Sequence, residues 1–183
     1  MLELLTQVCL QGISGDPAEK GYTIAGKEHT KILQENVSKT FGDYGPISER
    51  YADRNTMVSN LHRLACLIYV NRTASSVSSI DFHHKRLVRE GILLLTEMET
   101  CQNAWPLFII ACEAANDEQR LAILDVFEKS RQDRRRRWNH IHFIQHTVEA
   151  IWKQQDLDVE EELDYLTVLN AVISGLPFVP AFA

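Results

Sequence analysis

The sequence predicts an all-α fold, an irregular bundle of about seven to eight helices around one central apolar helix. Apolar residues recur at steps of three and four along most of the chain, which is the spacing of helices that bury one face. The 183 residues include only 8 Gly and 5 Pro, and 45% of them are hydrophobic, which suits a single domain over residues 1–183. Residues 107–112 are apolar on every side. We therefore expect that segment to lie at the centre of the bundle.

The first 48 residues carry the weakest pattern, with helical spacing only over residues 1–10 and, weakly, over residues 27–41. Glycine and other turn residues cluster within 11–27 and again within 42–48, so we expect two loops there. The best-supported helical core is residues 49–174. Residues 175–183 are expected to form an extended tail, because a glycine and two prolines interrupt any helix there.

Within the core, the start of each helix has its own signal. Asn103 is expected to cap a helix, because Pro106 then falls in the first turn, where its missing N–H costs nothing. Asn116 with Gln119 three residues later forms a variant of the capping box. Apolar spacing and these caps predict helices over residues 49–72, 80–100, 104–115, 116–132 and 138–153, with a last helix that ends at residue 174.

Large apolar side chains on these helices define the expected core. In the helix over 116–132 we expect Leu121, Leu124 and Phe127 to face inward. The four side chains that we expect to anchor the core as a whole are Trp105, Phe108, Phe127 and Trp152.

A local basic run contrasts with the net charge of -6, which disfavours binding of polyanions by the domain as a whole. The run is typical of a solvated loop between helices, of a nuclear-import signal, or of a direct nucleic-acid contact, in that order of preference. It comprises Lys129, Arg131, Arg134, Arg135, Arg136 and Arg137.

A metal-dependent enzyme is the alternative interpretation, and it rests on His142, His146 and Glu149. At helical spacing they share one arc, where two imidazoles and a carboxylate could hold a divalent ion. However, Phe143 stands where the H-E-x-x-H pattern requires its glutamate, and a solvated polar flank has the same spacing. No nucleotide-binding or nucleophile motif occurs. We expect a non-enzyme without catalytic, cofactor-binding or metal-ligating residues.

A membrane anchor is also not expected. The last 19 residues carry no formal charge, but polar residues and helix breakers interrupt them.

Several fragments together resemble the fungal-specific transcription factor domain, the C-terminal regulatory region of zinc binuclear cluster transcription factors. The strongest is Trp-Pro-Leu-Phe-Ile-Ile-Ala-Cys-Glu-Ala at residues 105–114, followed by Arg120. Residues 65–72 are similar to a second signature of that family, a Leu-Ile-Tyr-Leu-x-Arg helix end. Later signatures follow in the expected order at Ile151, Trp152, Asp156, Asp164, Tyr165 and residues 177–179.

The resemblance implies an all-helical regulatory domain in a nuclear transcription regulator, with other proteins of the transcription machinery as partners. It also implies a small hydrophobic effector, because some members are similar to sterol sensors. DNA would be contacted only through a zinc cluster, and this chain, with four scattered cysteines, lacks the six that build one. Ala111 replaces the expected Gly, and Tyr165 stands where Trp is common.

Overall fold

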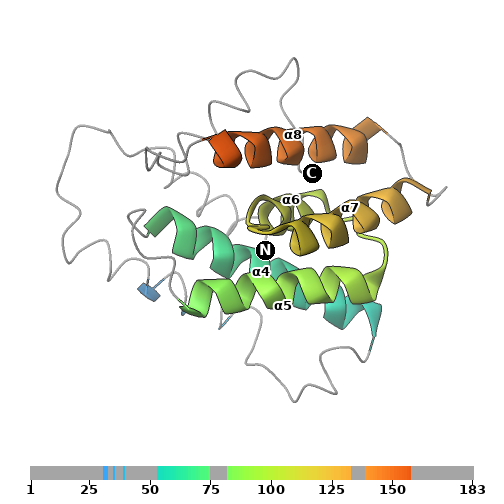
Figure 1. Cartoon of the computed structure of the whole chain (residues 1–183). Helices are drawn as coiled ribbons and strands as arrows, with labels where there is room; N and C mark the ends of the chain where they lie inside the picture. Colours follow the sequence, from blue (N-terminus) through green and yellow to red (C-terminus); the bar gives the residue numbers. More distant parts are fainter. Residues whose placement is uncertain are drawn as a thin grey trace.

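A computed structural model describes residues 53–74, 82–132 and 139–157, together with residues 31, 32, 35 and 39. This part of the chain contains five numbered helices and no strand, which confirms the all-α class (Figure 1). The expected count of seven to eight helices is not matched, because the helices expected near both ends of the chain lie outside the described segments. The five are α4 (Arg54–Ala74), α5 (Phe82–Met98), α6 (Ala104–Cys112), α7 (Asp117–Gln132) and α8 (Asn139–Leu157).

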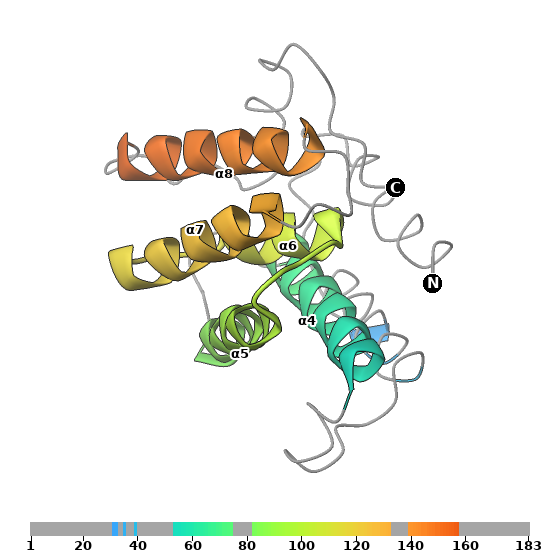
Figure 2. The ribbon, with the colours of Figure 1, turned by 90° about the vertical axis from the view of Figure 1, so that its right-hand side faces the viewer.

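The short helix α6 occupies the centre of the bundle. Helices α4, α5 and α8 all pack against it, and Figure 2 shows α6 between α8 on one side and α4 on the other. Every residue from Pro106 to Cys112 is buried, and Leu107 and Ile110 are 0% exposed. The expectation that this apolar run is the central helix is therefore confirmed.

One glycine allows α5 to approach α6 closely. A Cβ atom at Gly91 would lie 3.1 Å from Cδ1 of Ile110, which is tighter than ordinary van der Waals contact. Gly91 itself is buried within α5. The pair thus sets how near these two helices can lie.

Side chains that hydrogen-bond the first turn mark the starts of α4 and α7. Asp53 precedes α4, and its Oδ1 accepts the backbone N–H of Thr56 at 2.8 Å, which lowers the pKa of that carboxyl. Before α7, Oδ1 of Asn116 accepts the N–H of Gln119 at 2.9 Å, and Oε1 of Gln119 accepts the N–H of Ala115 at 2.9 Å. The predicted capping-box variant is confirmed.

Two details of the sequence-based prediction are wrong. Asn103 makes no side-chain cap for α6; only its backbone carbonyl oxygen bonds the first turn, where it accepts the N–H of Leu107 at 3.3 Å. Leu121 does not face the core and is 66% exposed. The buried residues of α7 are Ile123, Val126, Phe127 and Ser130, so Phe127 faces inward as expected, and Leu124 is partly buried against the core.

None of the helices in the described segments is long and apolar enough to span a lipid bilayer. The expectation about residues 165–183 concerns a segment outside those described.

Candidate functional site

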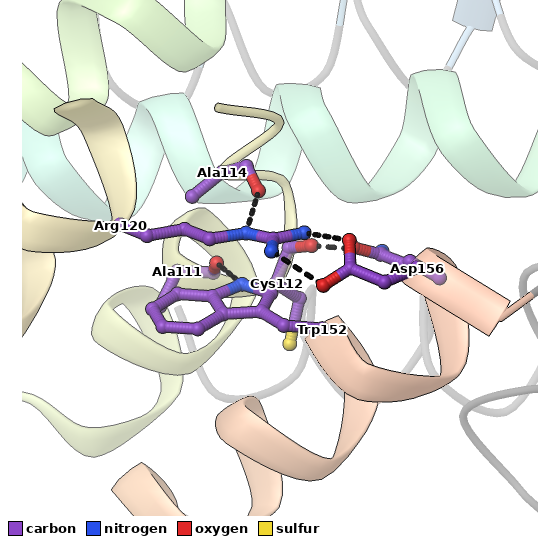
Figure 3. Close-up of polar contacts among 7 residues, drawn as sticks. Ala111, Cys112, Ala114, Arg120, Trp152 and Asp156 are labelled. Carbon is purple, nitrogen blue, oxygen red and sulfur yellow. Dashed lines mark hydrogen bonds and ion pairs between the residues drawn. The ribbon is translucent and has the colours of Figure 1, made fainter. Parts of the chain in front are cut away.

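Polar side chains from α4, α5, α7 and α8 meet at the C-terminal end of α6. Figure 3 shows those that α7 and α8 contribute, among them Arg120, Trp152 and Asp156. The last carbonyl groups of any helix lack partners within that helix, and burial makes an unpaired carbonyl costly. Here the end of α6 is buried, so its carbonyl groups need donors from elsewhere in the fold. We call this cluster the α6 end site; it comprises residues 111–114 with Arg72, His84, Arg120, Trp152, Gln155 and Asp156.

Donors from α7 and α8 satisfy three of these carbonyl groups. The indole Nε1–H of Trp152 donates to the oxygen of Ala111 at 2.9 Å, and Nε2 of Gln155 donates to the oxygen of Cys112 at 3.1 Å. Nε of Arg120 donates to the oxygen of Ala114 at 3.3 Å. Three side chains from two helices thus fix the end of α6.

Arg120 holds α7 and α8 together as well. Its two terminal nitrogens each donate to one oxygen of Asp156 at 2.8 Å, and its guanidinium lies 5.4 Å from the ring centre of Trp152. This bidentate geometry is what a planar guanidinium offers and an ammonium does not. The hydrogen bond with Asp156 raises the pKa of Arg120 and lowers the pKa of Asp156.

The opposite side of the site is formed by the carboxylate of Glu113. Its Oε2 lies 3.0 Å from Nε2 of His84 on α5, and its Oε1 lies 3.5 Å from Nε of Arg72 on α4. The side chains of Glu113 and His84 are only 6% and 7% exposed. A buried carboxylate that is paired in this way links α6 to both α4 and α5, and removal of the carboxylate is expected to be costly.

The chemistry of the α6 end site is that of a structural junction. Burial raises the pKa of the Cys112 thiol well above its ordinary value, so the thiol stays protonated and packs as a small apolar group. Within the segments that the structure describes, no set of three or more His, Cys, Asp or Glu residues is placed to hold a metal ion. The site therefore positions helices rather than reacting groups.

Comparison with known proteins identifies the family of the chain. The family described as the fungal-specific transcription factor domain matches residues 15–175. The chain belongs to this family. Transcription factor iacI of Pestalotiopsis fici is 27% identical to it over 184 residues, an alignment that covers 100% of this chain and 46% of that protein. No solved structure matches the chain.

Membership of this family indicates that the chain has a regulatory role in transcription and that it is not an enzyme. The resemblance to the family drawn from sequence fragments is thereby confirmed. Those fragments are far apart in the chain, yet Arg72, Glu113, Arg120, Trp152 and Asp156 from them all belong to the α6 end site.

Reasoning from the sequence missed the role of two members of this site. The sequence-based prediction gives His84 no role, and Glu113 enters it only as part of the motif at residues 105–114. The signal for His84 lay in its register, because it falls on the buried arc of α5 with Leu87, Val88 and Gly91. Its pairing with Glu113 required the tertiary structure.

The residues behind the alternative enzyme interpretation do not converge. His142 and His146 are exposed on α8, and their ring centres are 6.0 Å apart. The third member, Glu149, accepts a hydrogen bond from Nε2 of Gln145 at 2.7 Å. This arrangement matches the solvated polar flank weighed above.

The basic run lies mostly outside the described segments. Arg131 lies in the last turn of α7, and its guanidinium pairs with Glu128 one turn earlier. Lys129 pairs with Asp125 at 2.8 Å on the same helix. The remaining members, Arg134, Arg135, Arg136 and Arg137, lie outside the described residues.

The four expected anchors occupy different depths. Phe108, Phe127 and Trp152 are buried, with 2%, 0% and 5% exposure. Trp105 is half-buried and packs at the margin of the core against Tyr69, with 6.3 Å between the ring centroids. The first turn of α6 is therefore less enclosed than its end.

Proposed function

We propose that this chain is the regulatory part of a nuclear transcription regulator and that it acts through contacts with other proteins. The observation that carries the proposal is the family match over residues 15–175, together with the absence of a six-cysteine zinc cluster from the sequence. A domain of this family without its own DNA-binding cluster would influence transcription through contacts between its surface and other proteins. DNA contact is assigned to a zinc cluster outside these 183 residues.

The curated relative supports a role in transcription, because it is itself named a transcription factor. The chain spans 46% of the length of transcription factor iacI. The proposal requires no catalytic group and no cofactor in this chain. It extends to a small hydrophobic effector that binds between the helices and biases the contacts made by the domain.

A reporter assay tests the central claim. The whole chain is fused to an unrelated DNA-binding domain, and transcription is compared with that of the DNA-binding domain alone. The matched control is the same fusion with Glu113→Ala, which removes the carboxylate that joins α4, α5 and α6. We expect the wild-type fusion to change reporter output and the variant to return it toward baseline; a wild-type fusion without effect contradicts the proposal.

The same fusion addresses the effector. Apolar compounds of the sterol class are added, and a dose-dependent change in reporter output for the wild-type fusion supports the effector. An unchanged output across the series contradicts that part of the proposal.

A separate part of the proposal is that the basic run directs import of the chain into the nucleus. A fluorescent fusion of the whole chain is expected to accumulate in the nucleus, and replacing Arg134, Arg135, Arg136 and Arg137 by Ala should release it to the cytoplasm. The control replaces Lys85, Arg86 and Arg89 of α5, which removes a similar positive charge elsewhere. Equal distribution of wild type and the basic-run variant would contradict a role for these residues in import.

A further inference from the structure

The outward face of helix α5 carries two large apolar side chains, one at the first residue of the helix and one in its second half. Its buried residues, among them Leu87, Gly91 and Leu95, form one side of the helix and pack on the bundle. Phe82 and Leu93 lie on the opposite side and are 79% and 51% exposed. Eleven residues make about three helical turns, so these two side chains lie on one line about 16 Å apart.

Positive charge fills the space between these two apolar side chains. Lys85, Arg86 and Arg89 are all exposed, and at helical spacing they fall within the same outward arc. Residues 82–89 contain no Asp or Glu, although the chain as a whole has a net charge of -6. We call Phe82, Lys85, Arg86, Arg89 and Leu93 the α5 face.

The position of the α5 face makes its apolar residues unusual. Figure 2 shows α5 at the outside of the bundle, with the other helices on one side of it. The arc farthest from the core is where water favours polar side chains, and a large apolar side chain placed there gains nothing from the fold. Two such side chains, aligned and flanking three cations, form a pattern of binding anchors with charges that fix the register of a partner.

We propose that the α5 face is a docking surface for an acidic amphipathic helix of a partner protein. This inference rests on the proposed function, because it names the chemistry of the partner through which a regulatory domain would act. An antiparallel helix with two apolar residues eleven positions apart meets Leu93 and Phe82 in turn. Carboxylates at the intervening positions then lie opposite Arg89, Arg86 and Lys85.

Charge and shape favour this occupant over other polyanions. A DNA backbone offers phosphates to the three cations but nothing apolar for Phe82 and Leu93, and the negative charge of the domain opposes it. An acidic helix satisfies both kinds of group on the α5 face. Such a helix is only marginally stable in water when it is unbound, so docking on the α5 face would also order it.

The test uses the whole chain and a synthetic peptide of about 20 residues, long enough to form a helix. The peptide carries Leu at two positions eleven residues apart and Glu at the fourth, seventh and eighth positions after the first Leu. Its control carries Lys in place of each Glu. Binding is measured by fluorescence anisotropy at low and high salt, with a DNA duplex and anionic phospholipid vesicles as competing ligands.

Two variants of the chain decide the outcome. The charge reversal K85E/R86E/R89E and the truncation F82A/L93A are each expected to weaken peptide binding by about tenfold or more. The control L121A/K129E alters an exposed apolar residue and an exposed cation on α7 and should bind as the wild type does. All of the substituted side chains are exposed, and circular dichroism with thermal unfolding checks that each variant folds.

The proposal is supported if the acidic peptide binds, the Lys peptide does not, and salt weakens the binding. It is overturned if the acidic peptide fails to bind, if both α5-face variants bind as the wild type does, or if DNA or vesicles bind the α5 face more tightly than the peptide. If the peptide fails while the reporter fusion still changes transcription, the docking surface is wrong and the proposed function stands.

Discussion

Trp152 donates its indole N–H to the carbonyl oxygen of Ala111 at 2.9 Å, and this bond joins α8 to the central helix α6. The same oxygen also accepts the backbone N–H of Ala114 at 3.2 Å, so Trp152 supplies the second of its two donors. Both residues are buried, with 5% exposure for Trp152 and 0% for Ala111. The bond therefore supplies a donor to the C-terminal end of α6 and also fixes the position of α8 against it.

Replacement of Trp152 by Phe isolates this contribution. The variant keeps an aromatic ring but loses the donor, so we expect the free energy of unfolding in urea to fall by about 1 to 2 kcal/mol. The matched control is Trp105→Phe, which replaces a half-buried indole in the first turn of α6, at the opposite end of α6 from the carbonyl that Trp152 bonds. An equal loss in both variants would show that ring size, and not the hydrogen bond, determines the effect.

Arg120 should not be replaceable by Lys. An ammonium group cannot donate to both oxygens of Asp156 and to the oxygen of Ala114 at once, nor stack as a plane on Trp152. We expect Arg120→Lys and Arg120→Ala to lower the free energy of unfolding by similar amounts, about 1 to 3 kcal/mol. A double-mutant cycle with Asp156→Asn measures the part that belongs to the pair; a Lys variant as stable as the wild type would refute the requirement for a guanidinium.

The pair with Arg120 also predicts a pH dependence of stability. The pKa of Asp156 in the folded chain lies below its ordinary value of 3.8, because Arg120 hydrogen-bonds to the ionised carboxylate. The stabilisation is therefore present above pH 3.8 and is lost as the pH falls through the lowered folded pKa. Urea unfolding at a series of pH values below 5 should show a steeper loss for the wild type than for Asp156→Asn, and parallel curves would contradict the prediction.

The sequence predicts the helices better than it predicts the contacts between them. The apolar run of α6 requires burial whatever surrounds it, so its central place could be read from residues 107–112 alone. The inward face of α7 could be read only in part: Phe127 is buried as expected, but the step of three from Leu121 to Leu124 and the step of four from Ile123 to Phe127 both satisfy helical spacing. Only packing against α5 and α8 buries Ile123 and leaves Leu121 exposed.

The same distinction applies to the α6 end site. The capping box of Asn116 and Gln119 is local, and its pattern was visible in the sequence. The Glu113–His84 pair joins residues 29 positions apart, and the Arg120–Asp156 pair joins residues 36 positions apart. No local spacing encodes such pairs. The carbonyl groups at the end of a buried helix indicate that donor side chains must exist, but they do not indicate which residues supply them.

Glu113 should be among the most sensitive positions in the chain. Removing its carboxylate leaves the buried His84 and the guanidinium of Arg72 without this acceptor, and broken buried pairs typically cost about 3 to 5 kcal/mol. We expect a loss of about 3 kcal/mol for Glu113→Ala, measured by urea unfolding. Asp125→Ala, which breaks the exposed pair with Lys129, is the control and should be nearly neutral. A comparable result for both variants would mean that the buried pair contributes no more than a surface one.

The effect of Gly91→Ala on stability should change sign when the side chain of Ile110 is removed. Alanine favours a helix over glycine by about 1 kcal/mol, but its Cβ at position 91 would meet Ile110 Cδ1 at 3.1 Å and Cγ2 at 3.2 Å. Because Ile110 is 0% exposed, any shift would press it against other core side chains, so we expect Gly91→Ala to destabilise the wild-type chain.

Ile110→Ala removes the three atoms that an added Cβ would meet, at a cost of about 2 to 5 kcal/mol in the single variant. In that background Gly91→Ala should recover stability, because the helix preference then acts without the clash and the Cβ fills part of the cavity. Thermal and urea unfolding of the two single variants and the double variant measure this coupling. If Gly91→Ala has the same sign in both backgrounds, the close approach of α5 and α6 at this point is not what requires glycine.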